Sequence, residues 1–275
     1  MPIVCFTSDF GLLDAWVGVV HAVLFECSAD IRVVDITHEI DPFDIRRGAV
    51  VAVTAVHQLP GLTHLVVVDP GVGGQRRDVM IVTTDGTRLV GPDNGVLIPA
   101  ARRAGGIATA WSIQSALVGS AAPLATFHAR DVLAPAAARL ALGVDPATLG
   151  EAIDPLSLAS GPFAPAHREG GYLVSEVLDI DRFGSMRIGV DRTEFDGHVE
   201  PGATVEINSG HTTLHVPFGL TFSDVGDGEP VALFDSSGWL TVAVNGGSAA
   251  GRYGFEPGHQ VRVLVAGRSV PSDNA

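Results

Sequence analysis

The first 160 residues alternate short apolar runs with longer amphipathic segments. Apolar runs that are rich in β-branched residues predict strands at 3–6, 31–36, 65–68 and 79–83. Apolar residues at helical spacing predict helices at 12–25, 45–58 and 131–142, with Ser8 and Asp9 as candidate caps of the first and Asp44 of the second. This alternation is typical of an α/β domain with a largely parallel central sheet, which we predict over residues 1–162.

The pattern changes after residue 161. The stretch GPFAPAHREGG has no periodicity, and we predict a linker over residues 163–171. Short β-like runs separated by Gly, Asp and Ser then follow at 172–180, 187–190, 204–207, 212–216, 231–234, 240–244 and 261–265. They predict a smaller C-terminal all-β barrel or sandwich domain over residues 172–275.

Composition narrows the possible classes of protein. Hydrophobic residues make up 46% of the chain and charged residues 17%, which excludes a disordered protein. The 31 acidic residues exceed the 17 basic ones, and the net charge of -14 argues against nucleic acid as a partner. No apolar run is long enough to span a membrane, and the start MPIVCFTSDFG has no leader pattern, so we expect a cytoplasmic protein. We expect Cys5 and Cys27 to be reduced core residues.

Polar residues gather where the predicted strands end. Thr7, Ser8 and Asp9 follow the first strand, the segment 69–73 (DPGVG) follows the third, and TFHARD at 126–131 precedes an Ala-rich helix. Each segment alone fits an ordinary cap or turn. Ligands of open α/β sheets bind beyond the carboxyl ends of the strands, so three such segments together predict a site there.

Common motifs do not identify the chemistry of this site. The glycines of 71–74 match neither a dinucleotide fingerprint nor a P-loop. Arg76 and Arg77 fit anion binding, pairing with a carboxylate, or plain solvation. GxSxG, HExxH and CxxC are absent, so a serine nucleophile is unsupported and we predict no metal, although a metal-dependent hydrolase built on Asp9, His128 and Asp131 stays open as an alternative.

A series of segments carries a more specific signal. These are TSDFGLLDAWVG (7–18), HEIDPFD (38–44), VVDPGVGGQRR (67–77), GPDNG (91–95), TFHARD (126–131), DIDRFGS (179–185) and DSSGWLTVAVNGGSAA (235–250). Together and in this order they resemble the S-adenosylmethionine hydroxide adenosyltransferase family, which is related to the fluorinases and chlorinases. The resemblance covers nearly the whole chain.

The resemblance implies an enzyme that hydrolyses S-adenosylmethionine to adenosine and methionine. A sulfonium is already an activated leaving group, so the reaction needs neither a metal nor a cofactor, only an aligned and activated water. In the family an Asp, an Arg and a His serve this purpose, and the matching residues are Asp69, Arg76 and His128. Two alternative hypotheses are a halide-dependent halogenase of the same superfamily and a non-catalytic sensor of S-adenosylmethionine or adenosine.

Halogenases of the superfamily replace the carboxylate and the histidine of this triad. An anionic Asp69 would repel a halide, and the short stretch between Arg77 and Gly91 leaves no room for the extra loop of the fluorinases. The resemblance therefore favours hydrolysis over halogenation.

The resemblance also implies the residues that bind the substrate. In the α/β domain they are Asp9 for the ribose hydroxyls, Asp14 for the methionine ammonium, Phe43 and Phe127 as apolar walls around the ribose and sulfonium, and Thr126 as a further substrate-binding residue. In the β domain they are Asp181, Phe183 and Ser185 for adenine, Ser236 and Ser237 for the methionine carboxylate, and Asn245 and Ala250 closing the adenine pocket. The sequence departs from the family's usual Asn at Ser185, Glu at Thr241 and Gly at Ala129. The family's active site lies between subunits, so the resemblance further implies a homotrimer.

Overall fold

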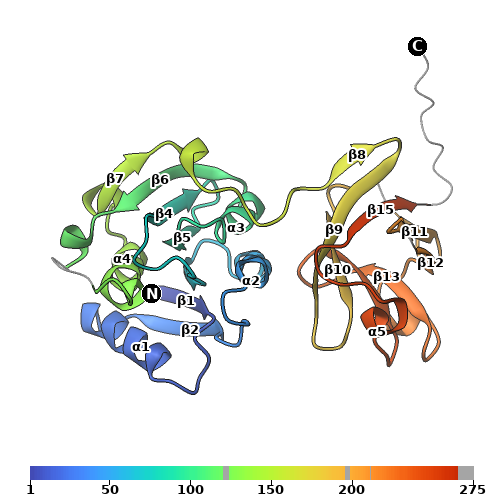
Figure 1. Cartoon of the computed structure of the whole chain (residues 1–275), viewed down its shortest axis with the longest axis horizontal. Helices are drawn as coiled ribbons and strands as arrows, with labels where there is room; N and C mark the ends of the chain where they lie inside the picture. The colour runs from blue at the N-terminus through green and yellow to red at the C-terminus, as the bar shows by residue number, and fades with distance from the viewer. Residues whose placement is uncertain (120–123, 196–198, 211, 266–275) are drawn as a thin grey trace, which may run out of the picture. The chain divides into compact units, whose positions relative to one another are not determined.

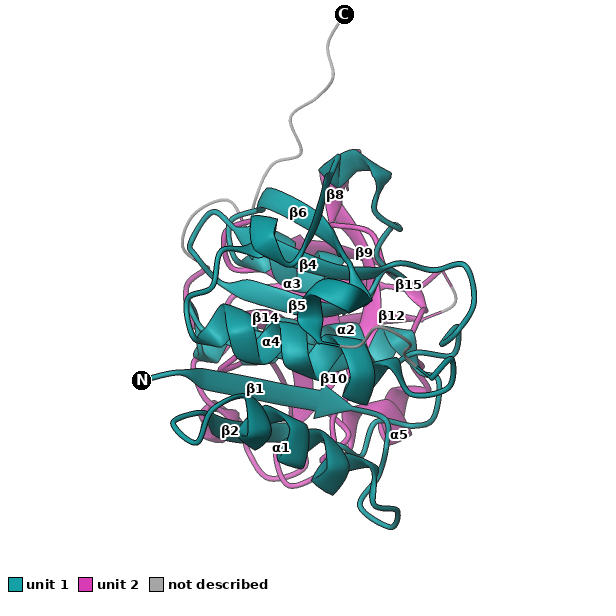
Figure 2. Cartoon of the chain, turned by 90° about the vertical axis from the view of Figure 1, so that its left-hand side faces the viewer, with its two compact units in different colours: residues 1–162 teal, residues 163–275 magenta. Residues whose placement is uncertain are grey.

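The computed structural model describes residues 1–119, 124–195, 199–210 and 212–265. The chain divides into two compact units, Met1–Pro162 and Phe163–Ala275 (Figures 1 and 2). Each has its own sheet and its own core. None of the helices within the described ranges is long and apolar enough to cross a membrane.

The first unit is built on a seven-stranded mixed sheet in the order β2-β1-β3-β5-β4-β6-β7. The strands are β1 (Ile3–Ser8), β2 (Arg32–Thr37), β3 (Thr63–Val67), β4 (Asp78–Thr83), β5 (Arg88–Pro92), β6 (Ile107–Ile113) and β7 (Gly150–Ile153). β1 pairs in parallel with β2 and β3, and β3 with β5, whereas β4, β6 and β7 pair antiparallel. The predicted α/β domain with a largely parallel core is confirmed.

Helices cover both faces of this sheet (Figure 1). They are α1 (Trp16–Cys27), α2 (Ile45–Gln58), α3 (Ile98–Arg103) and α4 (Ala134–Ala141), the last preceded by a π-helical turn at Ala129–Leu133. Single 3-10 turns occur at Ser115–Val118, Pro146–Thr148 and Pro155–Ser157. The apolar faces of α1 and α4 meet the sheet in one core that includes Phe6, Leu24 and Leu133.

The start of the first helix differs from the prediction. α1 begins at Trp16 after an N-cap at Ala15 that makes no side-chain cap, and Leu12 and Leu13 are 69% and 99% exposed. Ser8 and Asp9 do not cap the helix because their oxygens bind elsewhere, at His38 and at the Phe43 amide. The predicted cap of α2 is confirmed, since the Asp44 carboxylate accepts a hydrogen bond from the Arg47 amide.

The two cysteines have different surroundings. Cys5 is buried in β1, and its burial raises the pKa of the thiol to about 11. The expectation of a core position is wrong for Cys27, which is exposed because it is the last residue of α1. Both thiols are free.

The second unit is an antiparallel sheet of eight strands. They are β8 (His167–Glu169), β9 (Tyr172–Ile180), β10 (Met186–Asp191), β11 (Thr204–Asn208), β12 (Thr213–Pro217), β13 (Pro230–Phe234), β14 (Trp239–Val244) and β15 (Gln260–Val265), with a 3-10 turn at Phe222–Asp224 and helix α5 at Ala249–Tyr253. The order is β12-β11-β15-β9-β10-β14-β13, with β8 added to β9. A bridge between Phe218 and Ala232 joins the two edges, so the predicted all-β domain is a nearly closed barrel.

The segment predicted as a linker contains strand β8. Residues 167–169 pair with Leu173 and its neighbours across Gly170 and Gly171, which both have positive φ values of 53° and 84°. A Gly-Gly pair with positive φ is the geometry of a tight hairpin turn. Residues 167–169 therefore belong to the barrel sheet.

Candidate active site

Two acidic residues follow neighbouring parallel strands of the first unit. Ser8 at the end of β1 lies opposite Val67 at the end of β3, and the Asp9 amide donates to the Val67 carbonyl at 3.3 Å. Asp9 and Asp69 thus lie at the same carboxyl edge of the sheet, as the strand pattern predicted.

Asp69 holds Arg76 through both of its oxygens. Nε of Arg76 donates to Oδ1 at 3.0 Å and a terminal nitrogen donates to Oδ2 at 2.5 Å. The two side chains are only 10% and 7% exposed. Burial by itself lowers the pKa of Arg76, but the carboxylates of Asp69 and Asp78 outweigh this effect and raise it. The guanidinium therefore stays charged.

Asp78 joins Arg76 to His128. It is the first residue of β4, and its Oδ1 accepts a hydrogen bond from Arg76 while its Oδ2 lies 2.7 Å from Nδ1 of His128. Its side chain is 9% exposed. The three predicted catalytic residues are thus brought together in one network, Asp69–Arg76–Asp78–His128.

The sequence patterns do not single out Asp78 as a site residue. Two features of the sequence point to Asp78 as a partner of Arg76. Residues 76 and 78 lie on one face of an extended chain. A carboxylate at the start of a buried apolar strand also needs a polar partner. What the sequence did not contain was the identity of that partner, since His128 is 50 residues away.

A close approach of two loops brings His128 to this network. Gly73 has a φ of 74°, and a Cβ placed there would lie 2.2 Å from the carbonyl oxygen of Ala125. Only glycine fits this contact between the loop after β3 and the turn that leads to His128. The π-helical turn at 129–133 begins directly after His128, and such turns are frequent at functional sites.

Asp9 supports a strained residue. Its Oδ2 accepts a hydrogen bond of 2.9 Å from the amide of Phe43, which has a φ of 71° although it is not glycine. The Phe43 side chain is 69% exposed. Strain of this kind gathers at functional sites. Burial raises the pKa of Asp9, and the charge of Asp69 adds to this effect while the Phe43 amide opposes it.

The other predicted residues of this unit lie around the same loops. Asp14 and Thr126 are exposed, and Phe127 is half-buried. Phe127 packs edge-on against Trp16 at 5.2 Å and Phe10 at 6.0 Å between ring centroids. These contacts fix the turn that carries His128 against the start of α1.

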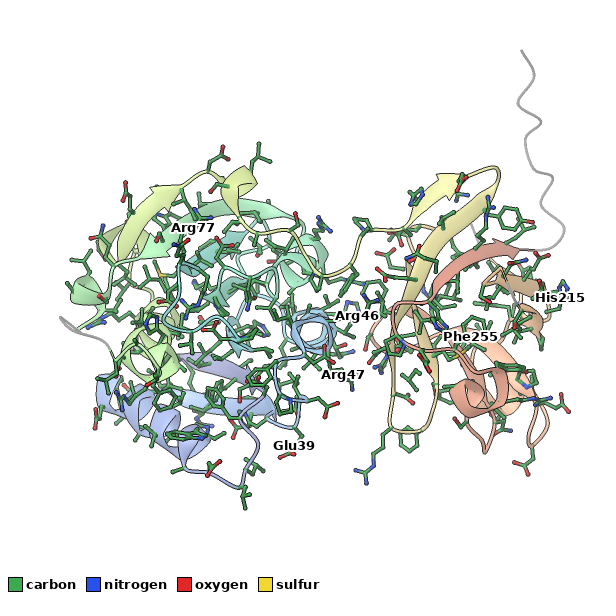
Figure 3. The ribbon with its side chains drawn as sticks, in the orientation of Figure 1. Glu39, Arg46, Arg47, Arg77, His215 and Phe255 are labelled. Atoms are coloured by element: carbon green, nitrogen blue, oxygen red, sulfur yellow. The ribbon has the colours of Figure 1, made fainter. Side chains whose placement is uncertain are left out.

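The adjacent arginines have different roles. Whereas Arg76 faces the network, Arg77 (labelled in Figure 3) donates to Asp93 at 2.5 and 2.8 Å and to the carbonyl of Ser157 at 2.6 Å. Arg77 therefore holds the GPDNG turn against the 3-10 turn at Pro155–Ser157. Successive residues of an extended chain point in opposite directions, which explains the separation.

The alternative metal site of the sequence analysis is not assembled. Asp131 pairs with Arg130 at 2.6 Å and accepts from the Leu124 amide at 2.8 Å. Hydrogen bonding from Arg130 is the main cause that lowers the pKa of Asp131. Among the described residues, Asp9, His128 and Asp131 do not come together as a set of metal ligands.

In the second unit, the predicted adenine residues form one turn. Asp181 Oδ1 accepts hydrogen bonds from the amides of Phe183 and Ser185, each at 2.9 Å. The Gly184 carbonyl accepts from the amide of Ala250, which ties this turn to α5. Ser185 is 6% exposed and Phe183 is 79% exposed. Asp181 shapes this turn, and Phe183 is exposed on it.

Ser236 and Ser237 lie in a separate turn, at the other end of β14 from Asn245. Asp235 forms this turn by accepting from the amides of Ser237 and Trp239, and Arg187 holds the Asp235 carboxylate at 2.7 Å. Asn245 donates to the Val225 carbonyl at 3.0 Å. Within this unit the structure therefore groups Ala250 with the 181–185 turn and keeps the two serines apart from it.

Each of the two units matches a domain of a known protein family. Residues 4–150 match the model of the SAM hydroxide adenosyltransferase N-terminal domain, and residues 175–262 match that of the C-terminal domain. The chain belongs to this family. The resemblance found in the sequence is thereby confirmed.

Members of the SAM hydroxide adenosyltransferase family with known activity are similar over their full length. An (R)-S-adenosyl-L-methionine hydrolase of Salinispora tropica is 40% identical over 96% of this chain and 98% of its own. The hydrolase of Thermus thermophilus is 42% identical over 95% and 99%. A fluorinase of an Actinoplanes species is 26% identical over 96% and 98%.

A solved structure shares the fold. A conserved protein of Thermotoga maritima, described as uncharacterized, is 30% identical with a TM-score of 0.86 over 95% of this chain and 99% of its own.

Proposed function

We propose that this protein hydrolyses S-adenosyl-L-methionine to adenosine and L-methionine. The observation that carries this proposal is the buried Asp69–Arg76–Asp78–His128 network at the carboxyl edge of the sheet. The greater similarity to hydrolases than to fluorinases supports it.

In the proposed reaction a water attacks the ribose C5′. The new O–C5′ bond forms as the C5′–S bond breaks, and the electron pair of that bond leaves with methionine as a neutral thioether. The water therefore loses one proton, which Asp69 or His128 accepts. Nδ1 of His128 contacts Asp78, so Nε2 is the ring nitrogen that faces this task. Arg76 stabilises the developing hydroxide character of the water.

Asp78 is a positioning residue in this mechanism. Its two oxygens hold Arg76 and His128, which fixes the distance between the two groups that would bind the water. A carboxylate behind a histidine also selects the tautomer and orientation of the ring. The proposed reaction needs no metal or cofactor, because the leaving group requires no acid.

The proposed substrate roles are carried over from the family to the matching residues, and the chemistry of each group suits its role. Asp9 would bind the ribose hydroxyls and Asp14 the methionine ammonium, while Phe43, Thr126 and Phe127 would line the ribose and sulfonium. Asp181, Phe183, Ser185, Asn245 and Ala250 would surround adenine, and Ser236 and Ser237 would receive the methionine carboxylate. We propose that a homotrimer combines residues 1–162 of one subunit with residues 172–275 of its neighbour at each site. The proposed setting is the cytoplasm, with the substrate as the small-molecule partner and with neither nucleic acid nor membrane involved.

A product assay tests the proposal. The purified protein is incubated with S-adenosylmethionine, with and without chloride and with and without a chelator, and the products are separated by liquid chromatography. Adenosine and methionine in equal amounts, unaffected by both additions, are expected. A 5′-chloro product would identify a halogenase, and unchanged substrate with measurable binding would identify a sensor.

Substitutions of the proposed catalytic residues test whether turnover depends on this site. Asp69→Ala and His128→Ala are expected to reduce turnover at least about 100-fold with the fold intact. His215→Gln, which changes an exposed residue of the barrel (Figure 3), serves as the control and should leave turnover unchanged. Near-normal rates in both site variants would overturn the mechanism.

A further inference from the structure

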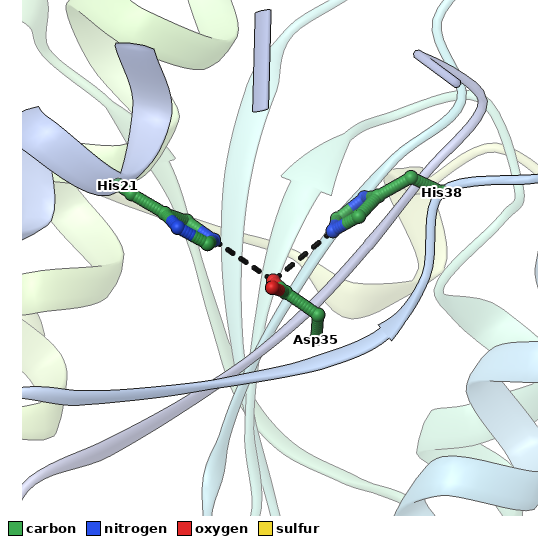
Figure 4. A group of neighbouring side chains, drawn as sticks. All are labelled: His21, Asp35 and His38. Atoms are coloured by element: carbon green, nitrogen blue, oxygen red, sulfur yellow. Dashed lines mark hydrogen bonds and ion pairs between the residues drawn. The ribbon is translucent and has the colours of Figure 1, made fainter. Parts of the chain in front are cut away.

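Three side chains outside the candidate active site converge at the β2 edge of the first sheet. His21 of α1, Asp35 of β2 and His38 just after β2 point toward one another (Figure 4). Nε2 of His21 lies 2.9 Å from Asp35 Oδ1, and Nε2 of His38 lies 3.0 Å from the same oxygen. Two imidazoles and one carboxylate are a common ligand set for divalent transition metals.

The spacing of the three ligand atoms is close to that of a metal site. One atom from each side chain lies within 4.8 Å of the other two. Metal–ligand bonds of about 2.0–2.1 Å in a tetrahedron place the ligand atoms about 3.3 Å apart. The carboxylate–imidazole distances of 2.9 and 3.0 Å need to open by a few tenths of an ångström to reach this spacing, and the two imidazole nitrogens, which lie within 4.8 Å of each other, need to close by at most about 1.5 Å.

His38 is held in place for this role. Its Nδ1 lies 2.8 Å from Ser8 Oγ, its ring packs 4.6 Å from the ring of Phe6 between centroids, and the residue is 4% exposed. A hydrogen bond at one ring nitrogen is the usual device that orients the other toward a metal. The serine thereby presents Nε2 to the group.

The buried Nε2 of His38 has no well-directed partner. It contacts Asp35 at 3.0 Å, but among the described residues it makes no hydrogen bond of good geometry. Buried polar atoms are nearly always satisfied, so a nitrogen whose nearest partner is one poorly directed carboxylate oxygen has the capacity to bind an additional ligand. Asp35, with 42% of its side chain exposed, leaves a path for an ion to enter.

We propose that His21, Asp35 and His38 bind a divalent transition-metal ion, with Zn²⁺ as the best fit. Imidazole nitrogens disfavour Mg²⁺ and Ca²⁺, which take oxygen ligands. With three protein ligands, water completes the coordination. The role is structural: the His38 carbonyl accepts from the Gly11 amide at 2.7 Å, and Ser8 directly precedes Asp9, so the ion braces the loop that begins at Asp9.

Spectroscopic metal binding tests the proposal without reference to activity. The untagged full chain is stripped with a chelator, desalted, and titrated with Co²⁺ at pH 7.5, followed by Zn²⁺. One equivalent of Co²⁺ should give the visible absorption of a low-coordinate site, Zn²⁺ should displace it, Mg²⁺ should not, and Zn²⁺ should raise the melting temperature.

His21→Gln and Asp35→Asn should each weaken Zn²⁺ binding at least about tenfold and abolish the rise in melting temperature. His215→Gln, which changes an exposed histidine elsewhere, should bind as the wild type does. Circular dichroism of the metal-free His21→Gln protein confirms that it is folded. A wild-type chain that binds no Co²⁺ or Zn²⁺, or a His21→Gln chain that binds as tightly as wild type, would show an ordinary His–Asp–His ion-pair cluster and overturn the proposal.

Discussion

Oδ2 of Asp78 lies 2.7 Å from Nδ1 of His128, although the two residues are 50 positions apart in the chain. The other oxygen of the same carboxylate binds Arg76, so one side chain fixes both groups that the proposed mechanism assigns to the attacking water. Substitutions in this network and in the neighbouring loops test the proposed roles of these residues.

Replacing Asp78 tests whether its carboxylate positions Arg76 and His128. Asp78→Asn removes the charge that holds Arg76 and His128, and we expect kcat to fall roughly 10- to 100-fold with little change in KM. Steady-state kinetics measures the two constants separately. Asp93→Asn is the matched control, because Asp93 is an equally buried partner of Arg77 outside the network. It should lower the melting temperature but leave kcat unchanged, and an equal loss of kcat in both variants would reduce Asp78 to a structural role.

Arg76 should not be replaceable by lysine. The guanidinium contacts two carboxylates at once, and its fork fits Asp69 with two hydrogen bonds. Arg76→Lys keeps the charge but loses this geometry, so we expect turnover to fall on the order of 100-fold. The loss of charge-assisted hydrogen bonds should also reduce the free energy of unfolding by about 2 kcal/mol, measurable by urea denaturation. Unchanged turnover would show that charge alone is sufficient.

Asp9 illustrates a conflict between stability and binding. Burial raises the pKa of its carboxyl in the folded protein, so the ionised form is disfavoured there and folding is less favourable above that pKa than below it. Asp9→Asn keeps an acceptor for the Phe43 amide and removes the charge. The variant should melt at a higher temperature than wild type at pH 7, and the difference should shrink as the pH falls toward about 4, where the unfolded aspartate is itself protonated.

The same variant should bind S-adenosylmethionine more weakly, because an amide cannot accept two ribose hydroxyls as a carboxylate does. Calorimetric titration measures this loss. A variant that melts below wild type at pH 7 would contradict the assigned effect of burial.

Two substitutions of Phe43 distinguish the cost of its strained backbone from the contribution of its ring to substrate binding. At a φ of 71°, glycine is unstrained whereas alanine retains the strain, so Phe43→Gly should be more stable than Phe43→Ala by about 1 kcal/mol. Both variants lose the ring and should weaken substrate binding to a similar extent. Thermal melting and binding titration of the pair measure the two effects independently. Equal stability of the two variants would show that the left-handed backbone carries no cost at this position.

Local patterns in the sequence determined much of this protein. The apolar runs predict the parallel strands, helical spacing predicts α2 with Asp44 as its cap, and the ends of the predicted strands bring Asp9 and Asp69 to the same sheet edge. These features depend on side chains a few residues apart, whose spacing is fixed by the backbone geometry of helices and strands. The ordered series of segments that resembles the family identifies Arg76 and His128 as further candidate catalytic residues. Several motifs in a fixed order are specific, whereas each motif alone is not.

Only the tertiary structure decided which partners those residues have. The pairing of β4, β6 and β7 turned half of the first sheet antiparallel, the bridge at Phe218 closed the barrel, and the use of Ser8 and Asp9 elsewhere moved the start of α1 to Trp16. The contact of Asp78 with His128 and the convergence of His21, Asp35 and His38 arise in the same way. Each joins residues that are distant in the chain, and such contacts depend on how whole elements pack rather than on any local spacing.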